Sequence, residues 1–356
     1  MMYSVIVGSG RCIPEREVKN EDFLHHEFYD QASQKIVEPT TDTITKFLKI
    51  TNIAKRRYAA PGQVTSDLAA QAARRALDSS GVDAETLDGI YVAHNFGDIC
   101  FGDHHSVMVP SLATKVKAAL NIKNPQAVAW DLIFGCPGWL QALIIADTQI
   151  KAGEAKRIMV IGAEIISRVC DPHDRDSMIY ADGAGAVILE GHWSAQPRGI
   201  LSKKVRTDAV NYHQLLVMEP SYNPAHPSEE LFLKMQGRKL YEYALNHVPQ
   251  VVKDCLDAAG LHLQDIAKVL IHQANEKMDE AILLRLAKMY GVTAVPAGLM
   301  PMTINELGNS SVATIPTLYD LISKGDLPGH HFQSGDHLVF ASVGAGMNVN
   351  AAVYRV

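Results

Sequence analysis

Two stretches far apart in the chain, 76–95 and 255–275, follow the same order of elements. Each has the end of a helix, a glycine that stops it, a short acidic segment, and an apolar strand that ends in a histidine. Such self-similarity constrains the fold strongly, because each copy must build the same supersecondary unit. We therefore expect two similar halves, 1–190 and 191–356, with the crossover between them near 190–200.

Short apolar runs alternate with longer amphipathic segments in both halves. Continuous Val/Ile/Leu strands separated by helices are typical of an α/β protein whose sheets are covered on both faces. The expected strands are YSVIVGSG (3–10), DGIYVAHN (88–95), AVAWDLIFG (127–135), RIMVIGAE (157–164), KVLIHQAN (268–275) and HLVFASVGAG (337–346). The expected helices cover 66–81, 138–153, 237–260 and 278–291.

Composition excludes several classes of protein. A hydrophobic content of 47% and a charged content of 20% over 356 residues indicate a globular chain with a sizeable core. The net charge of −6 and the lack of a basic block give no indication of a nucleic-acid partner. No apolar run reaches the roughly 20 residues of a membrane span, and no export signal is recognisable, so we expect a cytoplasmic protein. Five scattered cysteines fit reduced thiols.

Cys136 has the setting of a reactive thiol. It follows an expected strand that ends at Gly135, and an amphipathic helix is expected just after Pro137. A helix N-terminus has partial positive charge and free N–H groups, which favour a thiolate. Gly135 and Gly138 allow a tight turn, and proline suits the first turn of a helix. Most cysteines are small core residues, and we keep that interpretation for the other four.

Two polar residues of the second half are candidates to act beside this thiol. His272 ends an apolar run, where a neutral imidazole can accept a proton or donate a hydrogen bond to a carbonyl. Asn309 lies in GNSSVATIP, where its amide can donate to a substrate oxygen. Each also has a simpler interpretation, as a capping histidine and as a helix N-cap. The residues alone do not decide between these interpretations.

The motif GAG (344–346) follows the last long apolar run. Glycine-rich turns at strand ends can cradle phosphates, but this one lacks the dinucleotide-binding or P-loop pattern. Backbone N–H donors for an oxyanion are its better use. A second glycine-rich stretch, 181–191, is interpreted as structural, with a strand packed closely on neighbouring backbone.

Taken in order, Cys136, His272, Asn309 and the GAG turn resemble a known family. The chain is similar to the thiolase-like superfamily and, within it, resembles β-ketoacyl-acyl-carrier-protein synthase III nearly from end to end. The matching segments are TNIAKRRYA (51–59), the Cys136 turn, RVCDPHDRDSMIYADGAGAV (168–187), HQAN (272–275), GNSSVATIP (308–316) and GAGMNVNAAVYR (344–355). The resemblance implies a duplicated α/β thiolase-like fold, layered α-β-α-β-α with two mixed sheets.

The resemblance also implies a Claisen-type condensation. Cys136 would take an acyl group from a thioester, and His272 with Asn309 would stabilise the enolate of a malonyl- or β-ketoacyl-type thioester. Backbone N–H groups of Cys136 and Ala345 would hold the oxyanion. CoA or acyl-carrier-protein thioesters would be the substrates, with no metal and no permanently bound cofactor. We expect a role in specialised lipid or polyketide biosynthesis.

Departures from the family pattern concern the substrate. The TNIA segment (51–54) stands where acyl-CoA-using members have T-G-I-R, so an arginine over the CoA adenine is missing, although Arg168 still matches an arginine near the thioester and CoA channel. This departure predicts weakened CoA binding and a carrier-protein donor. The alternative is that another residue replaces the lost contact. Val109 and Met347 replace aromatic residues, which predicts a longer apolar acyl tunnel. A longer segment before Val109, 94–108, is an alternative filling of that space.

The resemblance implies partners as well. Lys277 and Arg285 match basic docking positions for an acyl carrier protein, which is acidic, although the plainer interpretation is a solvated helix face. A homodimer is expected, with a heterodimer of this chain and a paralogue as the alternative.

Other functions stay open at this stage. One is acyl transfer to an oxygen or nitrogen nucleophile without decarboxylation, and another is a non-catalytic partner subunit of a heterodimeric ketosynthase. The intact Cys136, His272 and Asn309 argue against both. A hydroxymethylglutaryl-type synthase would need a glutamate near the thiol, for which Glu164 is the candidate. A cysteine hydrolase would need a water-activating base, and His272 is the candidate.

Overall fold

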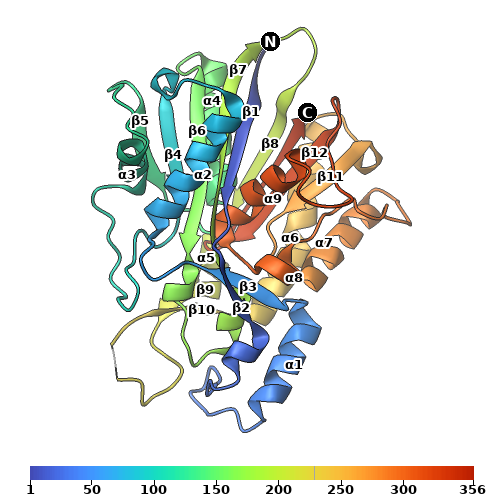
Figure 1. Ribbon diagram of the computed structural model, residues 1–356. Coiled ribbons are helices and arrows are strands. Elements are labelled where there is room, and N and C mark those ends of the chain that lie inside the picture. The colour runs from blue at the N-terminus through green and yellow to red at the C-terminus, as the bar shows by residue number, and fades with distance from the viewer. Residues whose placement is uncertain (228) are drawn as a thin grey trace.

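Two mixed β-sheets, one from each half of the chain, form the centre of the molecule (Figure 1). The structure is a computed structural model, in which residues 1–227 and 229–356 are described. In spatial order, the first sheet consists of β1 (Met2–Cys12), β7 (Asp182–Trp193), β6 (Arg157–Ile165), β4 (Gly89–Ala93) and β5 (Val128–Leu132). The second consists of β11 (Ile266–Ile271), β12 (His337–Gly344), β13 (Asn348–Arg355) and β8 (Gly199–Thr207). Each sheet has both parallel and antiparallel pairs, as expected.

Helices form three layers around these sheets. The outer face of the first sheet is covered by α2 (Thr65–Ser80) and α3 (Leu112–Ala119). Between the sheets lie α4 (Gly138–Ala152) and α9 (Thr314–Ser323). The outer face of the second sheet is covered by α6 (Gly237–Ala258) and α7 (Glu276–Met289). The predicted α-β-α-β-α order of layers is therefore confirmed.

The internal repeat corresponds to equivalent structure in the two halves. In the first copy, α2 leads through the short 3₁₀ turn η2 (Ala84–Thr86) to β4. In the second copy, α6 leads through η6 (Leu263–Asp265) to β11. Gly81 and Gly260 follow the two helices with φ angles of 65° and 68°, a left-handed conformation that ends a helix and that glycine adopts without strain.

A smaller unit lies below the sheets, at the end of the molecule opposite the two termini (Figure 1). The sequence analysis did not predict it, because most of its elements have only three to five residues and come from segments far apart in the chain. They are β2 (Arg16–Lys19), η1 (Asn20–Phe23), α1 (Thr40–Thr51), β3 (Lys55–Tyr58), η3 (Ile166–Arg168), η4 (Arg175–Ile179), β9 (Leu216–Glu219) and β10 (Phe232–Met235). The remaining short elements are α5 (Ala209–Tyr212), η5 (His213–Leu215), α8 (Ile304–Leu307) and η7 (Ser311–Ala313).

Arg56 of β3 holds this unit together. The side chain is fully buried, and its guanidinium donates to the carbonyl of Met178 at 2.7 and 3.0 Å. It also donates to Asn20 Oδ1 at 2.7 Å and to the carbonyl of Val18 at 3.3 Å. Burial lowers the pKa of this guanidinium to about 10, which still leaves it charged at pH 7. The guanidinium of Arg56 thus connects β2, η1 and η4 through its hydrogen bonds.

None of the helices in the part of the chain that the structure describes has the length and apolar character that crossing a bilayer requires.

We predict that Arg56→Lys lowers the free energy of unfolding by about 2–4 kcal/mol, because one ammonium group cannot reach acceptors in three directions and leaves buried carbonyls unpaired. Urea unfolding measures the change. Arg57→Lys is the matched control, since Arg57 points to Glu17 near the surface, 3.1 Å away. Equal losses for the two variants would show that Arg56 has no special role.

Candidate active site

Cys136 lies in a tight turn between β5 and α4. Gly135 has φ 67°, and a Cβ atom there would lie 2.8 Å from both the N and the O atom of Ala345. Only glycine fits such a position, because both the conformation and the space exclude a side chain. Pro137 directly precedes the first residue of α4, as its fixed φ favours. The predicted strand–turn–helix setting of Cys136 is therefore present.

The GAG turn lies against the turn that contains Cys136. A Cβ atom on Gly344 would lie 2.6 Å from the backbone N of Cys136. Among the described residues, no hydrogen bond is recorded for the N–H of Ala345. The turns that contain the backbone N–H groups of Cys136 and Ala345, one from each half of the chain, are therefore in contact. Met347 is fully buried in the core that β12 and β13 share with α6.

His272 follows the last residue of β11. Its backbone N–H donates to the carbonyl of Ala341 on β12 at 2.8 Å, and its side chain is 2% exposed. Burial lowers the pKa of the imidazole to about 4, with only a partial offset from the backbone of Ser311. At neutral pH the ring is therefore uncharged, and its Nδ1 is buried without a partner among the described residues.

Asn309 is fixed by its backbone and by its side chain. Its N–H donates to the carbonyl of Ile179 at 3.0 Å, and its own carbonyl accepts from Ala181 at 2.8 Å. Its Oδ1 accepts from the backbone N–H of Ser311 at 2.8 Å. Because the amide oxygen is bound to Ser311, the Nδ2 group is the part of the side chain that can donate a hydrogen bond to another partner.

Ser311 lies close to all three of these residues. Its N–H donates to Asn309 Oδ1 at 2.8 Å, its backbone raises the pKa of the His272 imidazole, and its hydroxyl lowers the pKa of the Cys136 thiol, so Ser311 is close to both of these groups. The three residues that the sequence singled out therefore converge on one point. The sequence analysis missed Ser311 itself. The signal available was its place two residues after Asn309, in a motif already selected.

Burial controls the charge of the thiol. Cys136 is half-buried, and burial raises the pKa of its thiol to about 11. The nearby hydroxyl of Ser311 lowers that pKa, and the nearby carboxylate of Glu164 raises it. The helix N-terminus was expected to favour the thiolate, but at rest the thiol is protonated because burial outweighs that effect.

Glu164, at the end of β6, is the only buried glutamate among the described residues. Burial raises the pKa of its carboxyl group to about 7, while His94 and the hydrogen bonds from Asn95 lower it. Its oxygens accept from the backbone N–H of Asn95 at 3.1 Å and from its Nδ2 at 2.7 Å. The carboxyl group thus faces Asn95.

A cavity of about 750 Å³ opens between the small lower unit and the second half. Its lining includes Ile179, whose carbonyl binds Asn309, and Ala274 and Asn275, which follow His272 in the chain. Among the described residues, the arginines that line it are Arg175 and Arg238. Arg168 is instead buried, and its guanidinium donates to the carbonyls of Ile99 and, at 3.0 Å, of Ala60.

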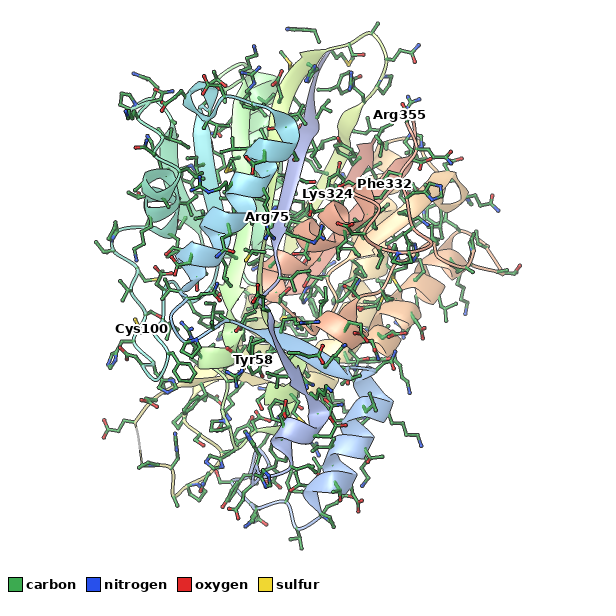
Figure 2. The ribbon with its side chains drawn as sticks, viewed as in Figure 1. Tyr58, Arg75, Cys100, Lys324, Phe332 and Arg355 are labelled. Carbon is green, nitrogen blue, oxygen red and sulfur yellow. The ribbon has the colours of Figure 1, made fainter. Side chains whose placement is uncertain are left out.

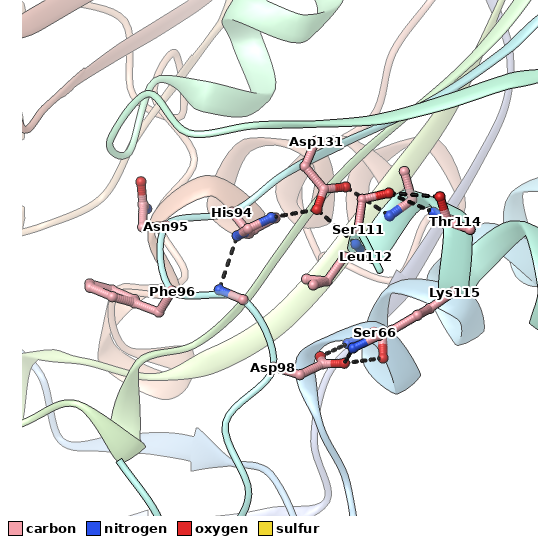
Figure 3. Close-up of polar contacts among 12 residues, drawn as sticks. Ser66, His94, Asn95, Phe96, Asp98, Ser111, Leu112, Thr114, Lys115 and Asp131 are labelled. Carbon is pink, nitrogen blue, oxygen red and sulfur yellow. Dashed lines mark hydrogen bonds and ion pairs between the residues drawn. The ribbon is translucent and has the colours of Figure 1, made fainter. Parts of the chain in front are cut away.

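Hydrogen bonds and ion pairs hold both ends of the segment that contains Val109 (Figure 3). His94 accepts from the N–H of Gly97 at 3.0 Å and binds Asp131 at 2.9 Å, and Asp131 also accepts from the first residues of α3. Asp98 accepts from Ser66 and, at 2.9 Å, from Lys115. Val109 lies between these two groups of contacts and is 86% exposed, so within a single chain its side chain does not reach the active site.

Both predicted docking residues are exposed on α7. Lys277 directly precedes Met278, which lines the cavity. Arg285 donates to Asn246 Oδ1 at 2.7 Å and to the carbonyl of Leu245. Within residues 1–227 and 229–356, no group of three or more His, Cys, Asp or Glu side chains is placed to hold a metal ion.

This duplicated, five-layered fold, with a cysteine from one half beside a histidine and an asparagine from the other, defines a thiolase-like condensing enzyme. The family model of 3-oxoacyl-[acyl-carrier-protein] synthase III matches residues 130–209 of this chain. A second model, of the C-terminal part of that synthase, matches residues 256–356. The β-ketoacyl-[acyl-carrier-protein] synthase III of Ruegeria pomeroyi is 34% identical over 99% of this chain and 98% of its own length. The chain belongs to the β-ketoacyl-acyl-carrier-protein synthase III family of acyltransferases.

Solved structures agree with this assignment. The 3-oxoacyl-[acyl-carrier-protein] synthase III of Aquifex aeolicus is 28% identical, with a TM-score of 0.80 over 99% of this chain and 100% of that one. The priming β-ketosynthase of the R1128 polyketide pathway is 26% identical, with a TM-score of 0.79 over 99% of this chain and 96% of that one. The predicted thiolase-like fold is confirmed.

We predict that the imidazole of His272 keeps one protonation state from pH 5 to pH 8, because its pKa is about 4. An ordinary histidine titrates near pH 6.5. NMR of the histidine side chains, assigned by comparison with His272→Asn, measures this directly. The neutral ring stabilises the fold above about pH 6.5, and this contribution is lost as the pH falls toward 4, because the unfolded chain binds the proton first. A His272 signal that moves between pH 5.5 and 7.5 would contradict the prediction.

Proposed function

We propose that the protein joins an acyl group held on Cys136 to the enolate of a malonyl- or β-ketoacyl-type thioester, in specialised lipid or polyketide biosynthesis. The observation that carries the proposal is the convergence of one thiol with an uncharged imidazole and the free amide of Asn309. A thiol serves as the nucleophile, and neutral donors suit a carbonyl that becomes an enolate.

In the first step, the sulfur of Cys136 attacks the carbonyl of an acyl thioester. The C–S bond to the donor breaks, and the proton of the Cys136 thiol leaves with the donor's sulfur. The raised pKa of the thiol means that attack and proton loss occur together instead of from a resting thiolate. The product of this step is a thioester on Cys136 and a free donor thiol.

In the second step, a malonyl thioester loses CO₂ and leaves an enolate. His272 and Asn309 donate hydrogen bonds to its oxygen, where negative charge develops. A charged imidazolium would give its proton away, whereas a ring with a pKa of about 4 stays neutral and holds the enolate ready to react. Loss of CO₂ supplies the electron pair for the new bond, so this chemistry needs no redox partner.

In the third step, the enolate carbon attacks the acyl carbonyl on Cys136. The oxyanion that forms would lie between the N–H groups of Cys136 and Ala345, whose turns are in contact. Its collapse breaks the bond to the Cys136 sulfur and releases a β-ketoacyl thioester. Cys136 regains a proton, and the enzyme returns to its starting state.

The 750 Å³ cavity would admit the thioester arm of acyl-CoA or of an acyl carrier protein. Cys136, His272 and Asn309 do not themselves line it, but its lining includes Ala274, two residues after His272, and Ile179, whose carbonyl accepts from the N–H of Asn309. Lys277, exposed beside this cavity, would attract an acidic carrier protein. Arg168 has a structural role in η3, so its proposed place in a CoA channel lacks support from its contacts.

We also propose a homodimer built on the free edge of β5. Among the described residues, that strand pairs only with β4. Val128, its first residue, and Ile133, which follows its last, are exposed apolar residues. An unpaired, apolar edge strand favours association. A two-fold axis at β5 would join the two first sheets and bring the exposed Val109 segment to the partner's acyl tunnel.

The first test is intact-protein mass spectrometry after incubation with a ladder of acyl-CoA and acyl-carrier donors. We expect one acyl adduct that is lost in Cys136→Ala and kept in Cys100→Ala, because Cys100 is an exposed surface thiol (Figure 2). Adding malonyl thioester should convert the adduct to a β-ketoacyl product. An adduct on Cys136→Ala would refute the assigned nucleophile. A stable adduct that yields no such product would favour simple acyl transfer.

The second test is the mass in solution by light scattering. We expect the wild type to be a dimer, and the double variant Val128→Lys, Ile133→Lys to have half that mass, because buried charges oppose the pairing of two β5 edges. Val210→Lys is the control, since Val210 is exposed on α5, away from that edge. A dimeric double variant would place the interface elsewhere, and a monomeric wild type would favour a paralogous partner.

A further inference from the structure

Most charged side chains of the 750 Å³ cavity already have a partner in the protein. Lys46 forms an ion pair with Glu38, which lines the same cavity. Arg238 forms an ion pair with Glu242, one turn further along α6, at 3.2 Å. Asp30 accepts the backbone N–H groups of residues 32 and 34 at 2.9 Å. The charges of these groups are therefore partly compensated before any ligand enters the cavity.

A buried lysine beside the cavity compensates two further carboxylates. Lys234 is 2% exposed, and its ammonium binds Asp171 and, at 3.5 Å, Asp174. The centroid of the Tyr222 ring lies 3.4 Å from the ammonium nitrogen, and Asp171 accepts from the backbone N–H of Tyr222 at 2.8 Å. The charge of Lys234 is thus placed on Asp171 and Asp174, and within the described residues it forms no ion pair with Asp176.

Asp176 is a carboxylate of the cavity wall that lacks such a partner. It belongs to η4, and its backbone N–H donates to Asp174 Oδ1 at 2.9 Å, which fixes the residue in the turn. In the part of the chain that the structure describes, its side chain forms no hydrogen bond or ion pair. A Cβ atom on Gly237 would lie 3.9 Å from Asp176 Oδ2, so the carboxyl group lies beside the first residue of α6, which also lines the cavity. The charge of Asp176 is therefore available to act on a ligand there.

Arg175, the residue before Asp176, contributes the opposite charge to the same part of the wall. It is exposed, lines the cavity and forms no ion pair among the described residues. Burial, followed by the charge of Asp174, raises the pKa of the Asp176 carboxyl group to about 7, while Arg175 and Lys234 lower it. Above pH 7 the carboxylate therefore offsets the attraction of Arg175 for an anion, and below pH 7 the protonated group does not.

We propose that Asp176 is a specificity-determining residue, whose carboxylate disfavours donors that carry a nucleotide and so selects a thioester arm attached to a carrier protein. This inference rests on the proposed function, in which the cavity admits that arm. Each phosphate of CoA adds negative charge, whereas pantetheine, the arm itself, is uncharged. A carboxylate in a partly buried wall repels the first ligand by Coulomb interaction and leaves the second unaffected. A protein-bound arm carries only the phosphodiester that joins it to the protein, so it is repelled less than CoA.

The test is a ligand-observed NMR titration with free CoA and with pantetheine. At pH 8 we expect Asp176→Asn to lower the dissociation constant of CoA about five- to tenfold and to leave that of pantetheine unchanged. At pH 6, where the wild-type carboxyl group is largely protonated, the same substitution should change the dissociation constant of CoA by less than about twofold. Neither ligand carries an acyl group, so failure of this test is distinguishable from failure of acylation at Cys136.

Two further variants make the test specific. Arg175→Gln should raise the dissociation constant of CoA and leave that of pantetheine unchanged, because it removes the attraction that Asp176 offsets. Asp42→Asn is the matched control and should change neither constant, since Asp42 is an exposed carboxylate on α1 that does not line the cavity. A CoA constant at pH 8 that is unchanged in Asp176→Asn, or that falls together with the pantetheine constant, would overturn the proposal. A fall for CoA that is as large at pH 6 as at pH 8 would overturn it as well.

Discussion

The contact between two turns, one from each half of the chain, is the constraint on which the active site depends. The turn at Gly135 and the turn at Gly344 approach so closely that neither position has room for a Cβ atom. Such an approach requires β5 and β12 to end at the same level between the sheets. The layered stacking of two equivalent halves provides this, and the duplicated fold is thus a means of bringing two strand ends into contact.

Burial in this contact region has one consistent electrostatic result. It lowers the pKa of His272 to about 4 and raises those of Glu164 and Cys136 to about 7 and 11. The histidine is a base, so its neutral form is favoured, and the two acids likewise keep their protons more tightly. A thiol and an imidazole that are uncharged at rest can respond strongly to charge that develops on a substrate, because little water is present to screen it.

The sequence predicted the elements whose signals are local. Cys136 between a strand and a proline, and His272 at the end of an apolar run, could be placed without knowledge of the fold, as could the repeat. The contact between Ser311 and Asn95 could not, because it joins segments far apart in the chain. The lower unit was missed for the same reason, since its short strands depend on Arg56 and on carbonyls remote in sequence.

The walls of the cavity bear on the choice between donors. Seven charged side chains line it, four of them acidic and three basic: Asp30, Glu38, Asp174 and Asp176, and Lys46, Arg175 and Arg238. Burial raises the pKa of Asp176 to about 7, so its charge is reduced near neutral pH. Such a balance gives little net attraction for the phosphates of a free nucleotide. Under the proposed function, selection would then depend on the fit of the thioester arm and on the surface around Lys277.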